Sequence, residues 1–140
     1  GRDLESAISK GLGVPVTQAR RLKIEGGLNE KYERGRVSRI LLPLISTIVS
    51  ELNNTLWFYR DRLRNQHPEF GDISSVYLCG GDANLIGLEK RISTAIKKTA
   101  LLANPFANLK FGAGVIPPIP KNESLKYTTA IGLALRAAGQ

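Results

Sequence analysis

The sequence predicts an α/β fold in which helices outnumber strands. Stretches with apolar residues every three or four positions predict the helices, and two short runs rich in β-branched and aromatic residues predict strands around one of them. The composition, 42% hydrophobic and 23% charged, is that of a globular protein and excludes fibrous and wholly disordered chains. The 140 residues suffice for one domain or two small lobes, and no apolar stretch approaches the ~20 residues of a membrane span.

The elements are expected in this order: helices at 3–12, 17–25 and 39–65, a strand at 73–79, a helix at 85–99, a strand at 101–103 and a helix at 124–138. Asp3 and Thr17 are the expected N-caps of the first two helices, because their side-chain oxygens can accept from free amides. Gly13 is the expected stop of the first helix, and Gly26-Gly27 ends the second. The polar run at 29–36 has no period and predicts a loop.

The third helix has the longest apolar stripe in the sequence. Its apolar positions are Leu41, Ile45, Ile48, Leu52, Leu56, Tyr59 and Leu63. Proline fits only the first turn of a helix, so Pro43 is expected in that turn and leaves the exact start of the helix open. We interpret this helix as a structural element, and Trp57 to Tyr59 as packing residues rather than a base-stacking platform.

A β-α-β unit is expected in the second half of the chain. Leu88, Ile92 and Ile96 are the expected buried face of its helix. Two strands are too few for a self-sufficient sheet, so further strands are missing either from this prediction or from the chain. The stretch at 111–120 is rich in Gly and Pro, and its last part, Pro117–Pro120, is expected to be extended.

The junction between the first strand and its helix is the one local pattern with a chemical rationale. Gly80 and Gly81 follow the strand directly, and glycine lets a backbone approach a flat ligand closely. The helix start that follows favours anionic or acceptor atoms, and open α/β sheets bind ligands beyond the carboxyl ends of their strands. A tight turn with no ligand is the alternative.

The remaining residues predict no catalytic group and no metal site. His67 is the only histidine and Cys79 the only cysteine, so neither a metal cluster nor an internal disulfide is expected. The net charge of +8 suggests an anionic partner such as nucleic acid, a membrane surface or a phosphate-bearing ligand. A surface left unbalanced in a fragment would explain the same charge.

The order of motifs resembles the second half of actin-like ATPases, and most closely the PilM family of type IV pilus assembly. The motifs are Gly1–Leu4, Thr17–Glu25, Glu51–Tyr59, the adenosine motif Val76–Leu88, Asn104–Phe106 and Ala130–Arg136. The resemblance runs from end to end and implies half of a ribonuclease H-like fold, with its small sheet completed by strands missing from this chain. It makes residues 1–40 a small nucleotide-side subdomain (subdomain 4 in actin) and 41–140 a larger one (subdomain 3).

The resemblance also implies one side of an adenosine pocket for ATP. The implied binding residues are Gly80, Gly81, Asp82, Asn84, Leu85, Lys23, Arg20 and Lys126. The family commonly has glutamate where Arg20 stands and a small residue where Asp82 stands, so altered nucleotide affinity is expected. The Mg²⁺ ligands are expected in the absent N-terminal half. The chain alone is therefore not expected to hydrolyse ATP, and weak ATPase activity of the full-length protein stays open.

The family implies a cytoplasmic scaffold at the inner face of the bacterial inner membrane. Its expected partners are the missing N-terminal half and inner-membrane pilus assembly proteins, and an open sheet edge invites self-association. One alternative is another bacterial actin-like protein of cell division or cell shape. Another is a basic scaffold or nucleic-acid module without a nucleotide, although nucleic acid is the less favoured partner because the basic residues form no single stripe.

Overall fold

The computed structural model describes residues 1–69, 71–107, 109 and 119–137. The helices are α1 (Arg2–Leu12), α2 (Val16–Gly26), α3 (Arg36–Phe58), α4 (Leu88–Ile96), α5 (Lys121–Ser124) and α6 (Thr128–Ala137), and the strands are β1 (Ser75–Leu78) and β2 (Thr99–Leu102). Single 3₁₀ turns lie at Tyr32–Gly35, Gly81–Asn84 and Leu125–Tyr127. This arrangement confirms the helix-rich α/β prediction.

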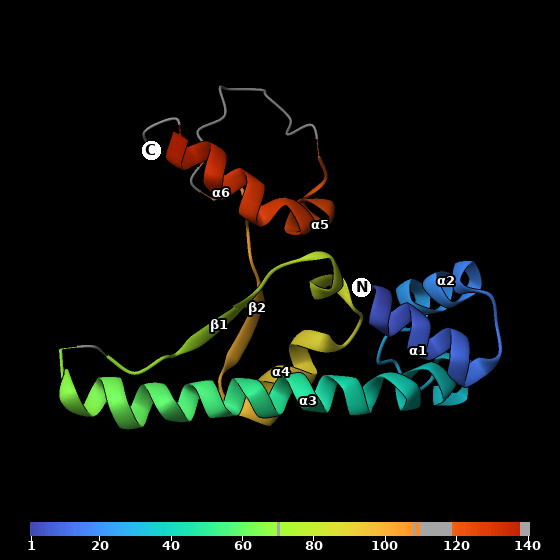
Figure 1. Ribbon diagram of the computed structural model, residues 1–140, viewed down its shortest axis with the longest axis horizontal. Helices are drawn as coiled ribbons and strands as arrows, with labels where there is room; N and C mark the ends of the chain where they lie inside the picture. The colour runs from blue at the N-terminus through green and yellow to red at the C-terminus, as the bar shows by residue number, and fades with distance from the viewer. Residues whose placement is uncertain (70, 108, 110–118, 138–140) are drawn as a thin grey trace.

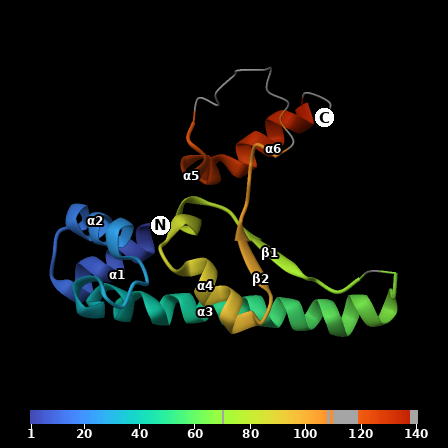
Figure 2. The ribbon, with the colours of Figure 1, turned by 180° about the vertical axis from the view of Figure 1, so that it is seen from behind.

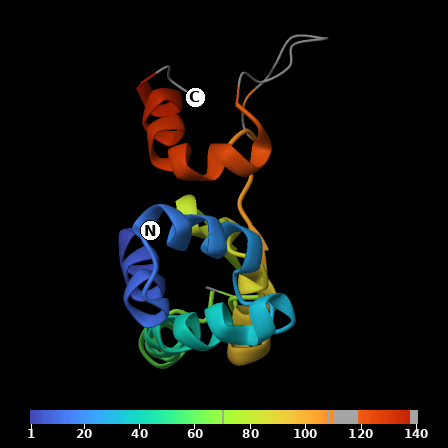
Figure 3. The same ribbon diagram turned by 90° about the vertical axis from the view of Figure 1, so that its right-hand side faces the viewer.

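The long helix α3 is the base on which the other elements sit. Figure 1 shows α1 and α2 at one end of α3 and the β1-α4-β2 unit along its middle. The view from behind and the view from the side both place α5 and α6 on the opposite side of the molecule from α3 (Figure 2, Figure 3). None of the described helices is both long enough and apolar enough to cross a membrane.

One hydrophobic core joins the first four helices and the sheet. Ile8 of α1 and Leu41 of α3 are fully buried, and Ile92 of α4 is 2% exposed. The apolar stripes of the sequence supply these residues, because a three-to-four spacing places them on one helix face. The same cluster includes Leu22 of α2 and Ala100 of β2. The two predicted subdomains, residues 1–40 and 41–140, therefore share one hydrophobic core. Their boundary, between residues 40 and 41, falls inside α3, and the division itself stays a prediction.

The two described strands run parallel, as the β-α-β prediction requires. Val76 pairs with Ala100 on the face that packs against the core. Tyr77 pairs with Leu101 on the other face, where these side chains are 66% and 40% exposed. One face of this small sheet is therefore uncovered by the described residues.

Two expectations for α3 were wrong. Pro43 lies inside the helix, beyond its first turn. A proline there costs about 3 kcal/mol, whereas each large apolar side chain buried from water contributes about 1.5–3 kcal/mol. Leu41 and Ile45, 0% and 1% exposed, offset that cost. Trp57 and Phe58, expected to be packing residues, are instead 64% and 52% exposed. Of the apolar stripe, Leu41 and Ile45 are buried, Leu52 and Leu56 are partly buried against the core, and Ile48 and Leu63 are exposed.

The expected caps were also wrong. Asp3 and Thr17 lie inside their helices, whose N-cap positions are taken by Gly1 and Pro15 without a side-chain hydrogen bond. Ser124 ends the short helix α5 and is fully buried instead of opening the last helix. Burial of these segments against their neighbours, not local capping, sets the helix starts.

Irregular backbone shortens or extends other expected elements. The 3₁₀ turn Gly81–Asn84 delays the start of α4 to Leu88. A π-helical turn, Tyr59–Arg64, carries the third helix to nearly its expected end. The expected loop at 29–36 contains the turn at Tyr32–Gly35, in which Glu33 and Arg34 have φ of 47° and 53° and interrupt the helical geometry. Most of the Gly- and Pro-rich stretch lies outside the described residues.

Gly27 lets the end of α2 approach the loop before α4. Its backbone has φ +50° and ψ −129°, a conformation that glycine alone adopts readily. A Cβ at this position would lie 2.8 Å from both the backbone nitrogen and the carbonyl oxygen of Ile86. The next residue, Leu28, donates its backbone N–H to the same Ile86 oxygen at 2.8 Å. A side chain at position 27 would therefore push the two segments apart.

We expect Gly27→Ala to destabilise the protein more than Gly13→Ala. Gly13 also has a positive φ, +66°, but a Cβ there meets nothing within 4 Å, so its substitution carries only backbone strain of about 1–2 kcal/mol. The measurement is the urea midpoint of each variant against wild type. Equal decreases in the urea midpoint of the two variants would show that the contact with Ile86 does not require glycine at position 27.

Candidate functional site

The strand-to-helix junction forms the centre of the candidate site. Gly80 lies two residues after the end of β1 and has φ +95° and ψ 168°, a conformation that would be strained for a residue with a side chain. Its backbone N–H donates to the carbonyl of Leu125 at 2.9 Å, so the junction is also held by the C-terminal segment. The 3₁₀ turn that follows is thereby presented to α2.

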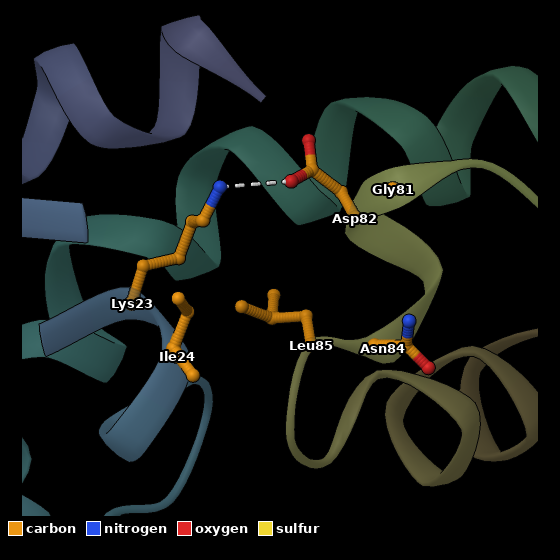
Figure 4. A pocket seen from close by; sticks show the side chains of 6 residues that line it. All are labelled: Lys23, Ile24, Gly81, Asp82, Asn84 and Leu85. Carbon is orange, nitrogen blue, oxygen red and sulfur yellow. Dashed lines mark hydrogen bonds and ion pairs between the residues drawn. The ribbon is translucent and has the colours of Figure 1, made fainter. Parts of the chain in front are cut away.

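A small pocket lies between this turn and α2 (Figure 4). Its volume is about 80 Å³, and its lining residues are Lys23, Ile24, Gly81, Asp82, Asn84 and Leu85. Ligand pockets usually enclose roughly 300–1,000 Å³. This pocket is therefore large enough for one edge of a nucleoside-sized molecule, not for all of it.

The structure brings most of the predicted site residues together and separates three. Gly80, Arg20 and Lys126 do not line the pocket. Arg20 is exposed on α2, one turn before Lys23. Lys126 lies beside the pocket, since a Cβ on Gly81 would lie 3.8 Å from the Lys126 Cβ.

Sequence reasoning missed Ile24, which lines the pocket next to Lys23. In Figure 4 the side chains of Ile24 and Leu85 point toward one another across the pocket. Ile24 is 62% exposed in the described structure. No local signal in the sequence identifies Ile24, because its role depends on Leu85, which is distant in the sequence.

Lys23 is the electrostatic centre of the pocket. Its ammonium donates to Glu5 Oε1 of α1 at 2.7 Å and to Asp82 Oδ1 at 3.0 Å. Lys23 is only 9% exposed, whereas most lysines on the surface of a helix extend into solvent. The second oxygen of Asp82 lies 2.7 Å from the backbone nitrogen of Gly1.

The pKa values of both members of this ion pair favour the charged state. Burial alone lowers the pKa of Lys23, but hydrogen bonds to Glu5 and Asp82 outweigh it and raise that pKa above its ordinary value. Burial alone raises the pKa of Asp82, but hydrogen bonding to its carboxylate, including the bond from Lys23, lowers it below the ordinary value. The negative charge that Asp82 adds is thus compensated inside the pocket.

Neither the backbone conformation nor the packing explains why residue 81 is glycine. Its φ is not positive, and a Cβ there would make only an ordinary contact with Lys126. A side chain could therefore be accommodated by the chain but would project beside the pocket. Glycine at this position suits the close approach of a ligand.

The described residues offer no metal site of their own. They contain no group of three or more His, Cys, Asp or Glu side chains placed to hold a metal ion. His67 pairs with Glu69 at 3.0 Å, away from the pocket, and Cys79 is exposed. The Mg²⁺ ligands expected elsewhere in the protein stay a prediction.

We expect Asp82→Asn to destabilise the protein at neutral pH by about 1.5 kcal/mol, the low end of the range for a hydrogen bond to a charged group, because the Asp82 side chain is 31% exposed. The contribution of Asp82 is present above the ordinary aspartate pKa of about 3.9 and is lost as pH falls through its lowered folded pKa. The contribution of Lys23 is complete below about 10.4 and is lost as pH rises through its raised pKa. The gap between wild type and variant should therefore be constant from about pH 5 to 9 and narrow below pH 4.

Urea unfolding of both proteins between pH 3 and 9 measures this gap. Glu123→Gln is the control, because it removes a carboxylate from the exposed pair with Lys126, where a change of less than about 0.5 kcal/mol is expected. A gap that does not depend on pH, or that the control reproduces, would refute the role given to the Lys23 ion pair.

Comparison with known proteins places this geometry in a family. The sequence matches the family model of the type IV pilus assembly protein PilM over residues 1–138. The fold is similar to a chain of a PilM-PilN type IV pilus biogenesis complex, with a TM-score of 0.72 and 23% sequence identity. The similarity covers 97% of this chain and 36% of that one, so the chain spans about a third of the length of its structural relative. Because the family model covers nearly all of the sequence and confirms the motif resemblance, the chain belongs to the PilM family of type IV pilus assembly proteins.

Proposed function

We propose that this chain forms the adenosine side of an ATP site in an actin-like protein that acts as a cytoplasmic scaffold for type IV pilus assembly. The observation that carries the proposal is the convergence of two segments far apart in sequence. Residues Lys23 and Ile24 of α2 meet the glycine turn Gly81–Leu85 across one pocket. This is the pairing that the resemblance to actin-like ATPases implies.

The pocket supports the proposal through its apolar walls. Ile24 and Leu85 point toward one another, and a flat base could pack between them. Gly81 leaves the backbone of the turn open to close approach. The small volume, about 80 Å³, fits a site whose opposite wall comes from another part of the protein.

Asp82 supplies the acceptor that Arg20 lacks. A guanidinium can only donate, whereas the family's usual glutamate could accept from ribose hydroxyls. The Asp82 carboxylate lines the pocket, and its lowered pKa keeps it an acceptor at neutral pH. We therefore assign to Asp82 the ribose contact and to Lys23 the positioning of that carboxylate.

The remainder of the fold is consistent with a chain that completes a larger protein. Tyr77 and Leu101 on the sheet and Leu133 on α6, which is 62% exposed, present apolar surface that further strands and helices would cover. In the proposal that covering part also supplies the Mg²⁺ ligands. Self-association through the outer strand edges is expected only where this part is missing.

The partner of the proposed scaffold is an inner-membrane pilus assembly protein. The structural relative is a complex of PilM with PilN, and a PilN-like protein is accordingly the partner we propose here. The match to the PilM family favours pilus assembly over cell division or cell shape. Weak ATP hydrolysis by the full-length protein stays open.

We expect the full-length protein to bind ATP with Mg²⁺ and Ile24→Ala to weaken that binding about five- to tenfold. The expected loss, about 1 kcal/mol, corresponds to the apolar area that the base would bury against this side chain. Isothermal titration calorimetry measures it. Ile24 is exposed, so the variant should fold normally.

Val16→Ala is the matched control for this titration. Val16 lies on the same helix, is 55% exposed and does not line the pocket, so its substitution should leave the affinity unchanged. The nucleotide proposal fails if the full-length protein gives no binding heat with ATP, or if the two variants lose affinity equally.

A further inference from the structure

A second and larger cavity lies behind the loop that forms the first pocket. Its volume is about 560 Å³, within the range of small-molecule sites. The loop after α2, the first turns of α3 and the start of α4 enclose it. Leu85 lines the first pocket and the next residue, Ile86, lines the second, and the two cavities share no lining residue.

The charges that line this cavity are mainly positive. Lys31, Lys90 and Arg91 line it, against the single carboxylate of Glu30. The other acidic residue near the start of α4, Glu89, is not among the lining residues, and its Oε1 accepts from the backbone N–H of Leu102 at 3.0 Å. An anion in the cavity would therefore meet more cationic than anionic groups.

The start of α4 adds to this positive potential. The helix has nine residues, and its N-cap, Gly87, makes no side-chain hydrogen bond. Gly87 and the first-turn residues Lys90 and Arg91 all line the cavity. The positive end of a helix dipole stabilises an anion placed at this position.

The unpaired hydroxyl of Ser38 indicates a ligand independently of charge. Ser38 lies in α3, is 1% exposed and lines the cavity. Its hydroxyl is the one buried side-chain polar atom of the described residues without a hydrogen-bond partner. A buried donor left unsatisfied destabilises the folded state, and alanine at this position would avoid that cost. An acceptor bound in the cavity would remove this cost.

The walls of the cavity are held in place without a ligand. Leu28 donates its backbone N–H to Ile86 at 2.8 Å, and a Cβ on Gly87 would lie 3.3 Å from the Leu28 Cβ. These contacts join the loop after α2 to the start of α4. The backbone that a ligand would meet is thus already ordered, and the side chains of Lys31, Lys90 and Arg91 are exposed at its edge.

We propose that this cavity binds a small molecule that carries a phosphate group. Lys31, Lys90 and Arg91 pair with the phosphate oxygens at the start of α4, and the Ser38 hydroxyl donates to one of them. Leu42 and Ile86 contact the apolar part of the ligand. A phosphate fits this donor set because it offers several acceptor oxygens to side chains and amides at once. The site is separate from the proposed ATP pocket and does not depend on it.

Titration of the full-length protein with pyrophosphate, by calorimetry at constant ionic strength, tests the proposal. Wild type should bind saturably, and Lys90→Ala and Arg91→Ala should each weaken binding about tenfold. Lys10→Ala is the control, because Lys10 is an exposed lysine of α1 that does not line the cavity and should leave the affinity unchanged. The absence of saturable heat, unchanged affinity in both cavity variants, or an equal loss in the control overturns the proposal.

Ser38→Ala separates a ligand contact from a structural role. We expect binding to weaken several-fold while the unfolding temperature without ligand stays the same or rises, because an unpartnered hydroxyl has been removed. A lower unfolding temperature with unchanged pyrophosphate affinity overturns the proposal. Because ATP binding is measured separately through Ile24→Ala, a failure of either site is distinguishable from a failure of the other.

Two further titrations identify the source of the phosphate. Binding to phosphatidylglycerol vesicles that Lys90→Ala and Arg91→Ala both abolish supports the same site with a lipid headgroup as its ligand. Binding to pyrophosphate alone supports a soluble phosphate. A polyglutamate peptide that binds through these residues while pyrophosphate does not overturns the proposal in favour of an acidic protein segment.

Discussion

The arrangement of this molecule depends on the close backbone contact between the end of α2 and Ile86. The hydrogen bond from Leu28 and the absence of a side chain at Gly27 let two distant segments meet at van der Waals distance. The contact fixes α2 against the turn after β1, and it leaves a hollow on each side. Leu85 faces one and Ile86 the other, so a single contact defines both candidate sites.

The ion pair between Lys23 and Asp82 reinforces this contact and gives the first pocket its character. A buried ammonium is costly unless carboxylates surround it, and Glu5 and Asp82 meet that requirement from two other segments. The pairing makes three parts of the chain interdependent. The pairing also changes the electrostatic effect of Asp82. An unpaired aspartate at this position would repel a nucleotide, whereas Asp82 paired with Lys23 offers acceptor oxygens without excess negative charge.

Periodic apolar residues made the fold predictable, and non-local contacts limited the prediction of the site. The stripes through Ile8, Leu41 and Ile92 predicted three helices and their buried faces because helical spacing is a local property. The motif after β1 predicted one wall of the pocket. Ile24 and Ser38 were not predicted, since a solitary isoleucine or serine on a helix has no pattern until its neighbours are known. The position of Pro43 was misjudged because burial on either side outweighed its local cost.

The structure distinguishes the cations of this basic chain that are paired with carboxylates from those that line the second cavity. Several cations are paired with carboxylates: Lys23 with Glu5 and Asp82, Lys98 with Asp72, and Lys126 with Glu123. The lining of the second cavity differs, because three cations meet one carboxylate beside a helix start and a buried hydroxyl without a partner. Cations spread over a surface need no ligand, whereas cations that line one cavity offer an anion several partners at once. Within the described residues, the anionic partner suggested by a net charge of +8 is therefore best accommodated behind Ile86.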